Sequence, residues 1–346
     1  MLIDAHLDLA FNAVGLGADL RMPLRELHTT EFGVAAAARG ETPTVALPAI
    51  RAADIRVVLG TIFVQKPTQA FNLVGPFYSS AEEANAQGWA QLRYYHDLDA
   101  QGEITLIGTS AELDAALSRA AALPGLVPLM EGADPIRNVD ELATWHQAGL
   151  RIVGPAWSGT RYSGGTGAPG PLTAAGRELV AALGEHHLAL DTSHMAEASF
   201  WEALRLFDGP VIASHANCRK FIPTDRHLSD DMIKALVERD GVVGVVLGNP
   251  FLVAGVSTDD GKAAVPLTAV VRHIEHICNL AGDTKHVGLG SDFDGGFGVE
   301  GIPDCIESIA DLPRIGGALR DAGWSADDIA GVLGGNWARW LRSCLP

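Results

Sequence analysis

Cysteine is scarce in this chain, and the few cysteines form no recognisable pattern. Four occur among 346 residues, at Cys218, Cys278, Cys305 and Cys344, and no pair has the CxxC spacing. A disulfide framework is not expected in a chain of this length, and free thiols suit a reducing compartment. Met1 is not followed by a basic segment, an apolar stretch and a cleavage site, so we expect no signal peptide and a cytoplasmic location.

Long apolar runs and basic residues are also lacking. No apolar run reaches about 18 residues, which predicts that no helix spans a membrane. The chain has 25 Lys and Arg against 42 Asp and Glu, a formal net charge of −17. This charge repels nucleic acid and anionic lipid, so neither is an expected partner. No GxGxxG or GxxxxGKS/T pattern follows an early strand, which excludes the usual nucleotide sites of open sheets.

Short, continuous apolar runs are abundant, and they alternate with helical patterns from end to end. Such runs are typical of strands that are covered on both faces. The predicted strands are Leu2–His6, Ile55–Val64, Ile104–Ile107, Leu126–Glu131, Leu150–Val153, Leu188–Ser193, Val211–Ser214, Val242–Leu247 and Val287–Gly290. The predicted helices are Ser80–Gln101, Ser110–Ala122, Val139–Ala148, Leu172–His186, Ala196–Phe207, Ser229–Arg239, Pro266–Ala281, Ile309–Ala322, Ser325–Leu333 and Asn336–Leu341.

This alternation predicts the fold class. About eight strand–helix units in one chain favour an α/β fold of the closed (β/α)8 TIM-barrel type over an open sheet. We predict that residues 1–346 form a single barrel domain with extra helices at the C-terminus. Residues 19–44 are expected to be a loop insertion after the first strand. The Gly-rich residues 158–171 are expected to be a lid loop at the catalytic rim, with a plain flexible connection as the alternative.

The ends of five predicted strands carry imidazole or carboxylate side chains. They are His6 with Asp8, Glu131, His194, His215 and Asp292. Reacting groups of a (β/α)8 barrel lie at the carboxyl ends of its strands, so these side chains are expected to share one rim. Each residue alone is more typical of a hydrogen-bonded structural group. Together, three histidines and several carboxylates exceed what one zinc ion needs and predict two metal ions bridged by a carboxylate.

These residues stand in the order of a known set of motifs. The set comprises His6-Leu7-Asp8, Glu131-Gly132, Ser193-His194, Ser214-His215, an R-x-x-x-D pattern from Arg226 to Asp230, and Gly290-Ser291-Asp292-Phe293-Asp294-Gly295. In this order the chain resembles the membrane (renal) dipeptidases, the M19 metallopeptidases, and the resemblance extends from His6 to Trp337. It implies a metal-dependent hydrolase on a (β/α)8 barrel.

The resemblance also implies roles for these residues. His6 and Asp8 would hold one zinc ion, His194 and His215 the other, and Glu131 would bridge them, with Mn, Fe or Co as other metals left open. Asp292 would handle protons beside a bridging hydroxide. Arg226 would bind the terminal carboxylate of the substrate, whereas its structural alternative is a salt bridge to Asp225 or Asp230.

One stretch departs from the family pattern. Family dipeptidases have Thr-His-Asn before the lid, and that histidine steadies the oxyanion near the scissile carbonyl. Here the stretch is Pro155-Ala156-Trp157-Ser158, so Trp157 stands in the place of the histidine. Either Arg161, Tyr162 or a backbone N–H of the lid compensates, or the reaction or the substrate differs. We therefore place Trp157 and Tyr162 among the substrate-binding candidates.

The resulting functional prediction is a binuclear zinc dipeptidase that acts on small dipeptides, with a D-residue at the C-terminal side as one option. The first alternative is hydrolysis of lactams or N-acyl amino acids by a related amidohydrolase. Such sites use an HxH pair and a modified lysine, whereas this chain has His6, Asp8 and Glu131. The second alternative is a metal-binding homologue without catalysis. A homodimer is one assembly that the sequence leaves open.

Overall fold

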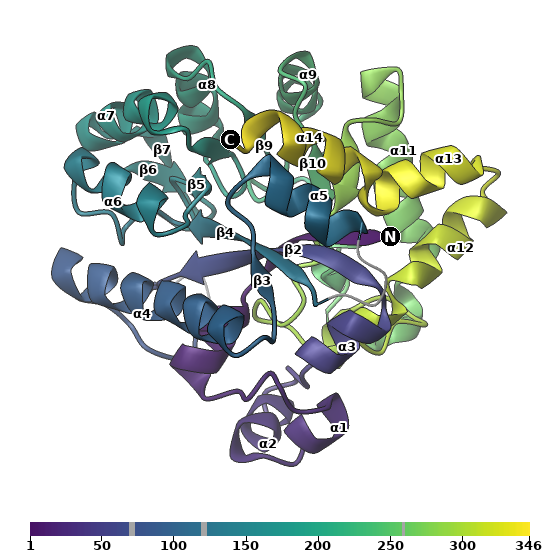
Figure 1. The fold of residues 1–346 in the computed structure, drawn as a ribbon. Helices are drawn as coiled ribbons and strands as arrows, with labels where there is room; N and C mark the ends of the chain where they lie inside the picture. The colour runs from purple at the N-terminus through teal and green to yellow at the C-terminus, as the bar shows by residue number, and fades with distance from the viewer. Residues whose placement is uncertain (69–72, 119–122, 258–259) are drawn as a thin grey trace.

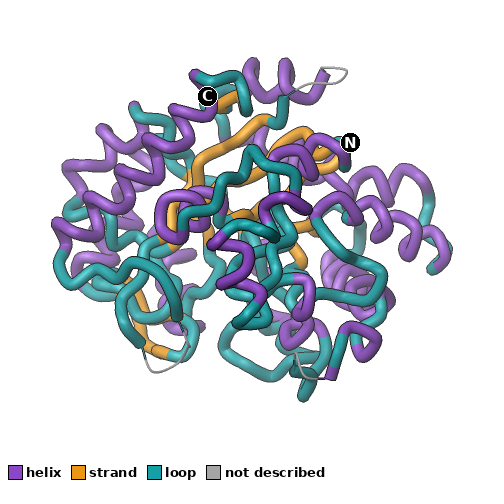
Figure 2. The backbone as a smooth tube through the Cα atoms, turned by 90° about the horizontal axis from the view of Figure 1, so that it is seen from below, coloured by secondary structure: helices purple, strands orange, loops and turns teal. Residues whose placement is uncertain are grey.

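Eight parallel strands form a ring at the centre of the molecule (Figures 1 and 2). The computed structural model describes residues 1–68, 73–118, 123–257 and 260–346. The ring follows the order β10-β11-β1-β2-β4-β5-β8-β9, and a parallel bridge from Ala213 to Val243 closes it. The ring strands are β1 Leu2–Leu7, β2 Ile55–Phe63, β4 Gly125–Glu131, β5 Ile152–Gly154, β8 Ala189–Asp191, β9 Val211–Ile212, β10 Val243–Val245 and β11 Val287–Leu289.

Helices surround this ring, and the predicted (β/α)8 barrel with extra C-terminal helices is confirmed (Figure 1). Helices that follow or cover the strands are α3 Leu47–Ala52, α4 Ala81–Ala100, α5 Ser110–Ser118, α6 Leu142–Gln147, α7 Ala174–Leu183, α8 Glu197–Leu206, α9 Asp230–Glu238, α10 Asn249–Leu252 and α11 Leu267–Ala281. The C-terminal helices are α12 Pro313–Asp321, α13 Ala326–Ala330 and α14 Asn336–Cys344. The predicted end of the Ser110–Ala122 helix lies outside the described residues.

The structure changes one predicted strand and shows how two predicted helices are capped. The predicted strand Ile104–Ile107 becomes β3 (Thr105–Leu106), which pairs with β4 outside the order of the ring. Ser229 precedes α9 and caps it, because its side chain accepts from the backbone N–H of Met232. Helix α5 begins at Ser110, and its capping side chain is that of Thr109, which accepts from the backbone N–H of Glu112.

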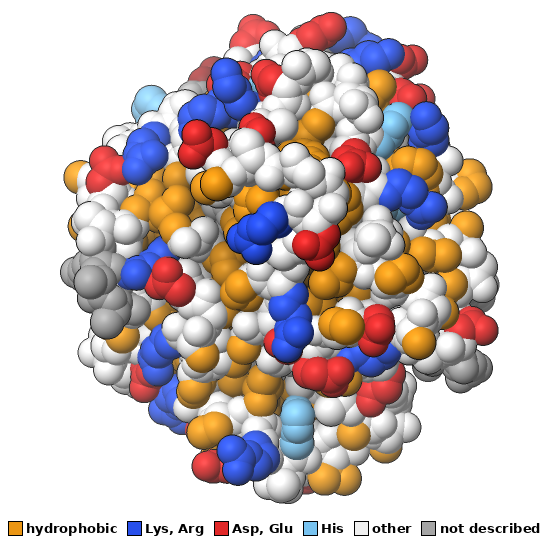
Figure 3. Space-filling view, turned by 90° about the vertical axis from the view of Figure 1, so that its right-hand side faces the viewer, with side chains coloured by type: hydrophobic (Ala, Val, Ile, Leu, Met, Phe, Trp, Pro, Cys, Tyr) orange, Lys and Arg blue, Asp and Glu red, His pale blue; other side chains and the backbone are white. Residues whose placement is uncertain are grey.

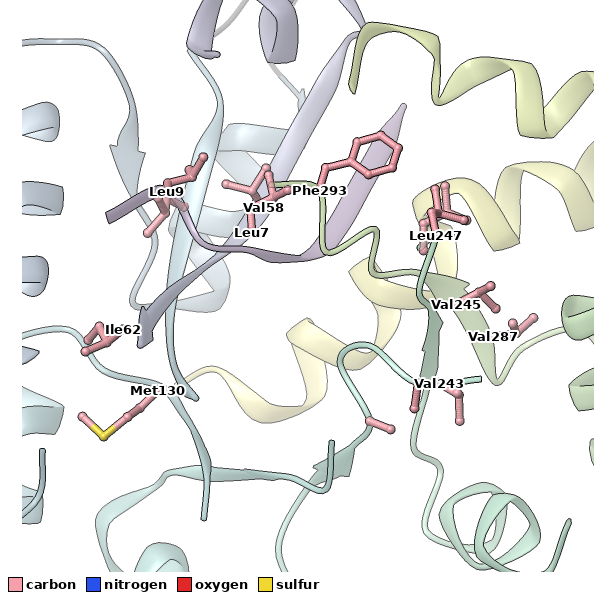
Figure 4. Packing of buried hydrophobic residues seen from close by; sticks show 14 of the residues in the cluster. Leu7, Leu9, Val58, Ile62, Met130, Val243, Val245, Leu247, Val287 and Phe293 are labelled. Carbon is pink, nitrogen blue, oxygen red and sulfur yellow. The ribbon is translucent and has the colours of Figure 1, made fainter. Parts of the chain in front are cut away.

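The barrel strands bury apolar side chains on both faces. Alternate residues such as Val57 and Leu59 fill the interior of the ring. Val58 and Ile62 belong to the outer layer, which packs against the surrounding helices (Figure 4). Helix α14 packs across the amino-terminal ends of the strands, and Trp337 donates from Nε1 to the carbonyl of Leu289 at 3.0 Å. This packing leaves the carboxyl ends of the strands as the open end of the barrel.

The two segments predicted as loops contain secondary structure. Residues 19–44 include α1 (Leu24–Leu27) and α2 (Glu31–Ala37), which lie at the lower edge of Figure 1. Residues 158–171 include an antiparallel hairpin of β6 (Ser163–Gly165) and β7 (Ala168–Leu172). The role of this hairpin as a lid and the organisation as one domain stay predictions.

Two further observations concern the helices and one face of the surface. Among the described residues, no helix combines the length and the apolar character that crossing a membrane requires. On the face in Figure 3, basic and acidic side chains lie interspersed among apolar ones.

Candidate metal centre

A β-bulge in β1 turns its first two ligand candidates toward the interior of the barrel. Asp4 pairs with Val58 and Leu7 pairs with Gly60, so β1 has one more residue than β2 between these positions. Bulges re-aim side chains at functional sites. As a result His6 points inward like Ala5 before it, and Leu7 packs into the outer hydrophobic layer. Asp8, at the end of the strand, also faces the cavity described below.

Glu131 lies at the centre of three imidazoles. Its Oε1 atom is 3.2 Å from Nε2 of His194 and 3.3 Å from Nε2 of His215. Its Oε2 atom is 3.4 Å from Nε2 of His6. The two carboxylate oxygens therefore face different histidines, as a bridging carboxylate would. The structure thus brings together His6, Asp8, Glu131, His194 and His215, and all five are buried.

Hydroxyl groups hold the opposite edge of each imidazole. Ser214 donates from Oγ to Asp191 at 2.6 Å, and the same Oγ lies 3.1 Å from Nδ1 of His6 and 2.9 Å from Nδ1 of His215. Because its only proton goes to Asp191, Ser214 accepts from both imidazoles. Thr166, in the hairpin loop between β6 and β7, lies 2.9 Å from Nδ1 of His194. These contacts leave the three Nε2 atoms free to bind a cation.

Several carboxylates share this buried space, and their charges shift the pKa values of their neighbours. Burial, reinforced by the Glu131 charge, raises the pKa of Asp8 to about 7. Burial also raises the pKa of Asp292 well above its usual value, and the charges of Asp8 and Glu131 add to the effect. Burial lowers the pKa of His6, but three neighbouring carboxylates outweigh it and raise the value to about 9. A cluster of this kind gains from added positive charge.

Two aspartates follow strand β11, and their side chains make different contacts. Asp292 and Asp294 have φ angles of 59° and 63°, which lie in a backbone region that residues other than glycine rarely adopt. Asp292 faces the centre, with Oδ1 4.0 Å from Nε2 of His6. Asp294 instead accepts from the N–H and Oγ1 of Thr44 and from the N–H of Val45. It therefore fixes the end of the 19–44 insertion.

A cavity of about 660 Å³ opens above the centre, and Arg226 lies in its wall. The guanidinium is buried, and neither Nη1 nor Nη2 has a hydrogen-bond partner in the described part of the chain. The salt bridges weighed as alternatives are absent there, because Asp225 accepts from Gly167 and Asp230 pairs with His276. Trp157 also lines the cavity. Arg226 is thus a cation poised to meet an anion from outside the protein.

Tyr162 does not reach the cavity among the described residues. Its side chain is buried, and its hydroxyl donates to the carbonyl of Ile136. Arg161 also turns away, because its Nε lies 3.1 Å from Oδ1 of Asp134. The lid sequence offered no spacing signal for these directions, since the hairpin pairing sets them. The structure therefore does not bring Tyr162 to the substrate side as predicted.

The sequence analysis did not identify three side chains that support the ligand candidates. Thr61 of β2 donates to Asp8, Thr166 contacts His194, and Asp191 receives the Ser214 hydroxyl. Asp191 lies near the carboxyl end of the predicted strand Leu188–Ser193, which was a usable signal. Thr61 and Thr166 are ordinary threonines in sequence, and only the closed ring and the hairpin bring them to their partners.

The donor set fits a pair of divalent transition-metal ions. Nε2 of His6 is buried and has no hydrogen-bond partner among the described residues. Nε2 of His194 and Nε2 of His215 lie only 3.0 Å apart, an arrangement that a shared cation relieves. Mixed imidazole and carboxylate donors suit zinc. A parallel barrel with such a cluster at the carboxyl ends of its strands defines a metal-dependent hydrolase.

Comparison with known proteins gives the family. The model of the membrane dipeptidases, peptidase family M19, matches residues 1–344, and the chain belongs to this family. It is therefore a metallo-dipeptidase, a hydrolase of peptide bonds, in agreement with the resemblance found in the sequence.

Individual relatives share much of the chain. An uncharacterized protein in the pqqA 5′ region of Klebsiella pneumoniae is 34% identical over 269 residues, covering 74% of this chain and 95% of that protein. The dipeptidase aclJ of Aspergillus oryzae is 30% identical over 227 residues, covering 63% of this chain and 52% of its own length. A metallopeptidase of Rhodobacter sphaeroides, liganded with a phosphinate mimic of L-Ala-D-Ala, is similar in structure with a TM-score of 0.80. It is 27% identical, and the match covers 99% of each chain.

The shared hydroxyl of Ser214 leads to a testable prediction. Ser214→Ala should lower zinc affinity by about 10- to 100-fold, because it removes the hydrogen bond that orients both His6 and His215. Zinc titration against a competing chelator measures this change. Ser343→Ala is the matched control, since Ser343 bonds to the carbonyl of Trp340 far from the centre. Equal zinc affinity in both variants would remove the orienting role of Ser214.

Proposed function

We propose that the protein hydrolyses small dipeptides with a free terminal carboxylate at a centre of two zinc ions. The observation that carries this proposal is the position of Glu131, whose two carboxylate oxygens face separate histidines. The partnerless guanidinium of Arg226 in the wall of the same cavity supplies the second element. A metal centre beside a buried cation suits a substrate whose scissile amide lies next to a free carboxylate.

Each ion would have its own side chains. His6 and Asp8 would hold one zinc, His194 and His215 the other, and Glu131 would bridge them. When bound, such a pair supplies Lewis acidity toward the carbonyl and acidifies a water to a pKa of about 7. The hydroxyls of Ser214 and Thr166 keep the imidazole rings in place while the ions bind.

The remaining side chains act on the substrate and on protons. Asp292, buried beside His6, would accept a proton from the attacking water and deliver it to the leaving amine. Arg226 would hold the terminal carboxylate with its planar fork of N–H groups and so set the position of the scissile amide. The L-Ala-D-Ala mimic on the Rhodobacter sphaeroides protein supports a D-residue at the C-terminal side.

Metal analysis and a substrate panel test the proposal together. We expect about two zinc ions per chain in the loaded protein, and hydrolysis of L-Xaa-D-Ala dipeptides that chelator treatment abolishes and zinc restores. One ion per chain at saturation would contradict the binuclear centre. Zinc-loaded protein without activity on dipeptides, but active on lactams or N-acyl amino acids, would contradict the dipeptide assignment.

A further inference from the structure

The cavity above the metal centre has two unlike sides. The strands β1, β2, β4 and β5 are consecutive in the ring, and β9, β10 and β11 are consecutive in the remaining arc. Cavity residues that follow β9, β10 and β11 include Arg226, Phe251 and Phe297. Those on the arc of β1, β2 and β5 include aromatic side chains and also Arg39, whose guanidinium is paired with Glu41 at 2.8 Å. The polar anchor and the second aromatic group therefore lie on different arcs of the rim.

The second group is a connected aromatic wall made of Phe11, Phe63 and Trp157. The rings of Phe11 and Phe63 meet edge to face with centroids 5.1 Å apart, and those of Phe63 and Trp157 also lie 5.1 Å apart. The ring centroid of Trp157 lies 6.2 Å from that of His194. The aromatic wall thus begins beside a ligand candidate, and all three of its rings line the cavity.

The 19–44 insertion extends this apolar side. Phe32 and Ala36, one turn apart on α2, both line the cavity. Asp294 anchors the end of the insertion through Thr44 and Val45. The apolar side is therefore held in place by hydrogen bonds to the loop that carries Asp292, and it does not depend on a loose surface segment.

The position of Arg226 fixes how a substrate would lie. Its guanidinium is buried over the ring of Phe251, with 5.4 Å between Cζ and the ring centroid. A carboxylate bound there places the C-terminal residue on the arc of β9 to β11. The scissile amide would then lie over Glu131, and the N-terminal residue would extend toward the aromatic wall. A volume of about 660 Å³ is in the range of pockets that accept drug-sized ligands.

We propose that the substrates are dipeptides whose N-terminal residue has a large apolar side chain, which packs against the aromatic wall. This inference rests on the proposed function for the direction in which the substrate lies. Trp157 contributes an apolar surface to this contact. This role accounts for a tryptophan in the place where the family has a histidine. A methyl side chain at the same position would leave the aromatic wall exposed to water.

Binding and turnover should both show this preference. The first measurement is calorimetric binding of phosphinate mimics of L-Ala-D-Ala and L-Phe-D-Ala to the zinc-loaded full chain. The second is kcat/KM for the corresponding dipeptides. Burying a phenyl ring is worth about 10- to 100-fold in binding, so we expect the L-Phe mimic and dipeptide to be favoured by that factor.

Variants of the aromatic wall locate the preference. Phe63→Ala and Phe11→Ala should each lower the ratio of the L-Phe to the L-Ala dipeptide by about tenfold. Phe221→Ala is the matched control, because Phe221 is half-buried beside His273 and does not line the cavity. We expect that control to keep the wild-type ratio. Wild-type ratios in both wall variants would overturn the inference even if the native protein prefers L-Phe.

The two measurements separate this inference from the proposed function. Hydrolysis of both dipeptides with equal kcat/KM and equal binding of both mimics would overturn the inference and leave the dipeptidase proposal standing. Tighter binding of the L-Phe mimic without hydrolysis of any dipeptide would support the inference and contradict the proposed reaction. Failure of both mimics to bind would overturn both.

Discussion

Asp292→Asn is expected to lower kcat by about 10²- to 10⁴-fold while the zinc content stays at the wild-type level. Asparagine has nearly the same shape but cannot accept and return a proton, and general acid–base groups contribute about this factor. The position of the carboxyl beside His6, at 4.0 Å, is the structural basis for the role. Steady-state kinetics with parallel metal analysis gives both quantities from one preparation.

A matched variant and the metal content make this test specific. Asp231→Asn removes the same charge from a side chain that is 82% exposed on α9, and it should leave kcat unchanged. Unchanged turnover in Asp292→Asn would remove the assigned role. A loss of zinc in that variant would make Asp292 a ligand, in keeping with its position next to His6 and Asp8.

Arg226→Met is expected to reduce kcat/KM for dipeptides with a free carboxylate by about 30-fold or more. Removing one partner of a buried charge pair costs roughly 2–5 kcal/mol. The loss should be confined to substrates with that carboxylate, so the C-terminal amide of the same dipeptide should change little. Comparing the two substrates on one enzyme preparation isolates the contribution of the carboxylate.

Arg226→Lys refines this second test. Lysine keeps the positive charge but has no planar fork of N–H groups, so it should recover part of the loss. Equal losses for the free dipeptide and its amide in Arg226→Met would indicate that Arg226 supports the cavity wall and does not bind the substrate. Its contact with the ring of Phe251 is the packing that such a result would point to.

The convergence of the ligand candidates was predictable because a barrel brings the carboxyl ends of all its strands to one rim. Once alternating runs indicated a closed ring, residues as distant as His6 and His215 had to approach one another. The direction of His6 was less predictable. Its inward orientation depends on an extra residue in β1, which the alternation of the sequence does not show.

The parts that the sequence could not supply depend on packing between distant segments. Tyr162 follows Trp157 closely in the chain, yet only Trp157 lines the cavity, because the β6–β7 hairpin turns Tyr162 toward Ile136. The strand at Thr105–Leu106 has an ordinary apolar pattern, and only the direct pairing of β2 with β4 leaves it outside the ring order. Local residue patterns do not encode such choices.

The hydrogen bonds that Asp294 accepts from Thr44 and Val45 have a mechanical consequence. They tie the mouth of the cavity to the loop in which Asp292 stands two residues earlier. A substrate side chain that presses on Phe32 would therefore also shift the loop that carries Asp292, the proposed proton carrier. Substrates that differ only in that side chain should consequently differ in the rate of the chemical step, and not merely in how tightly they are held.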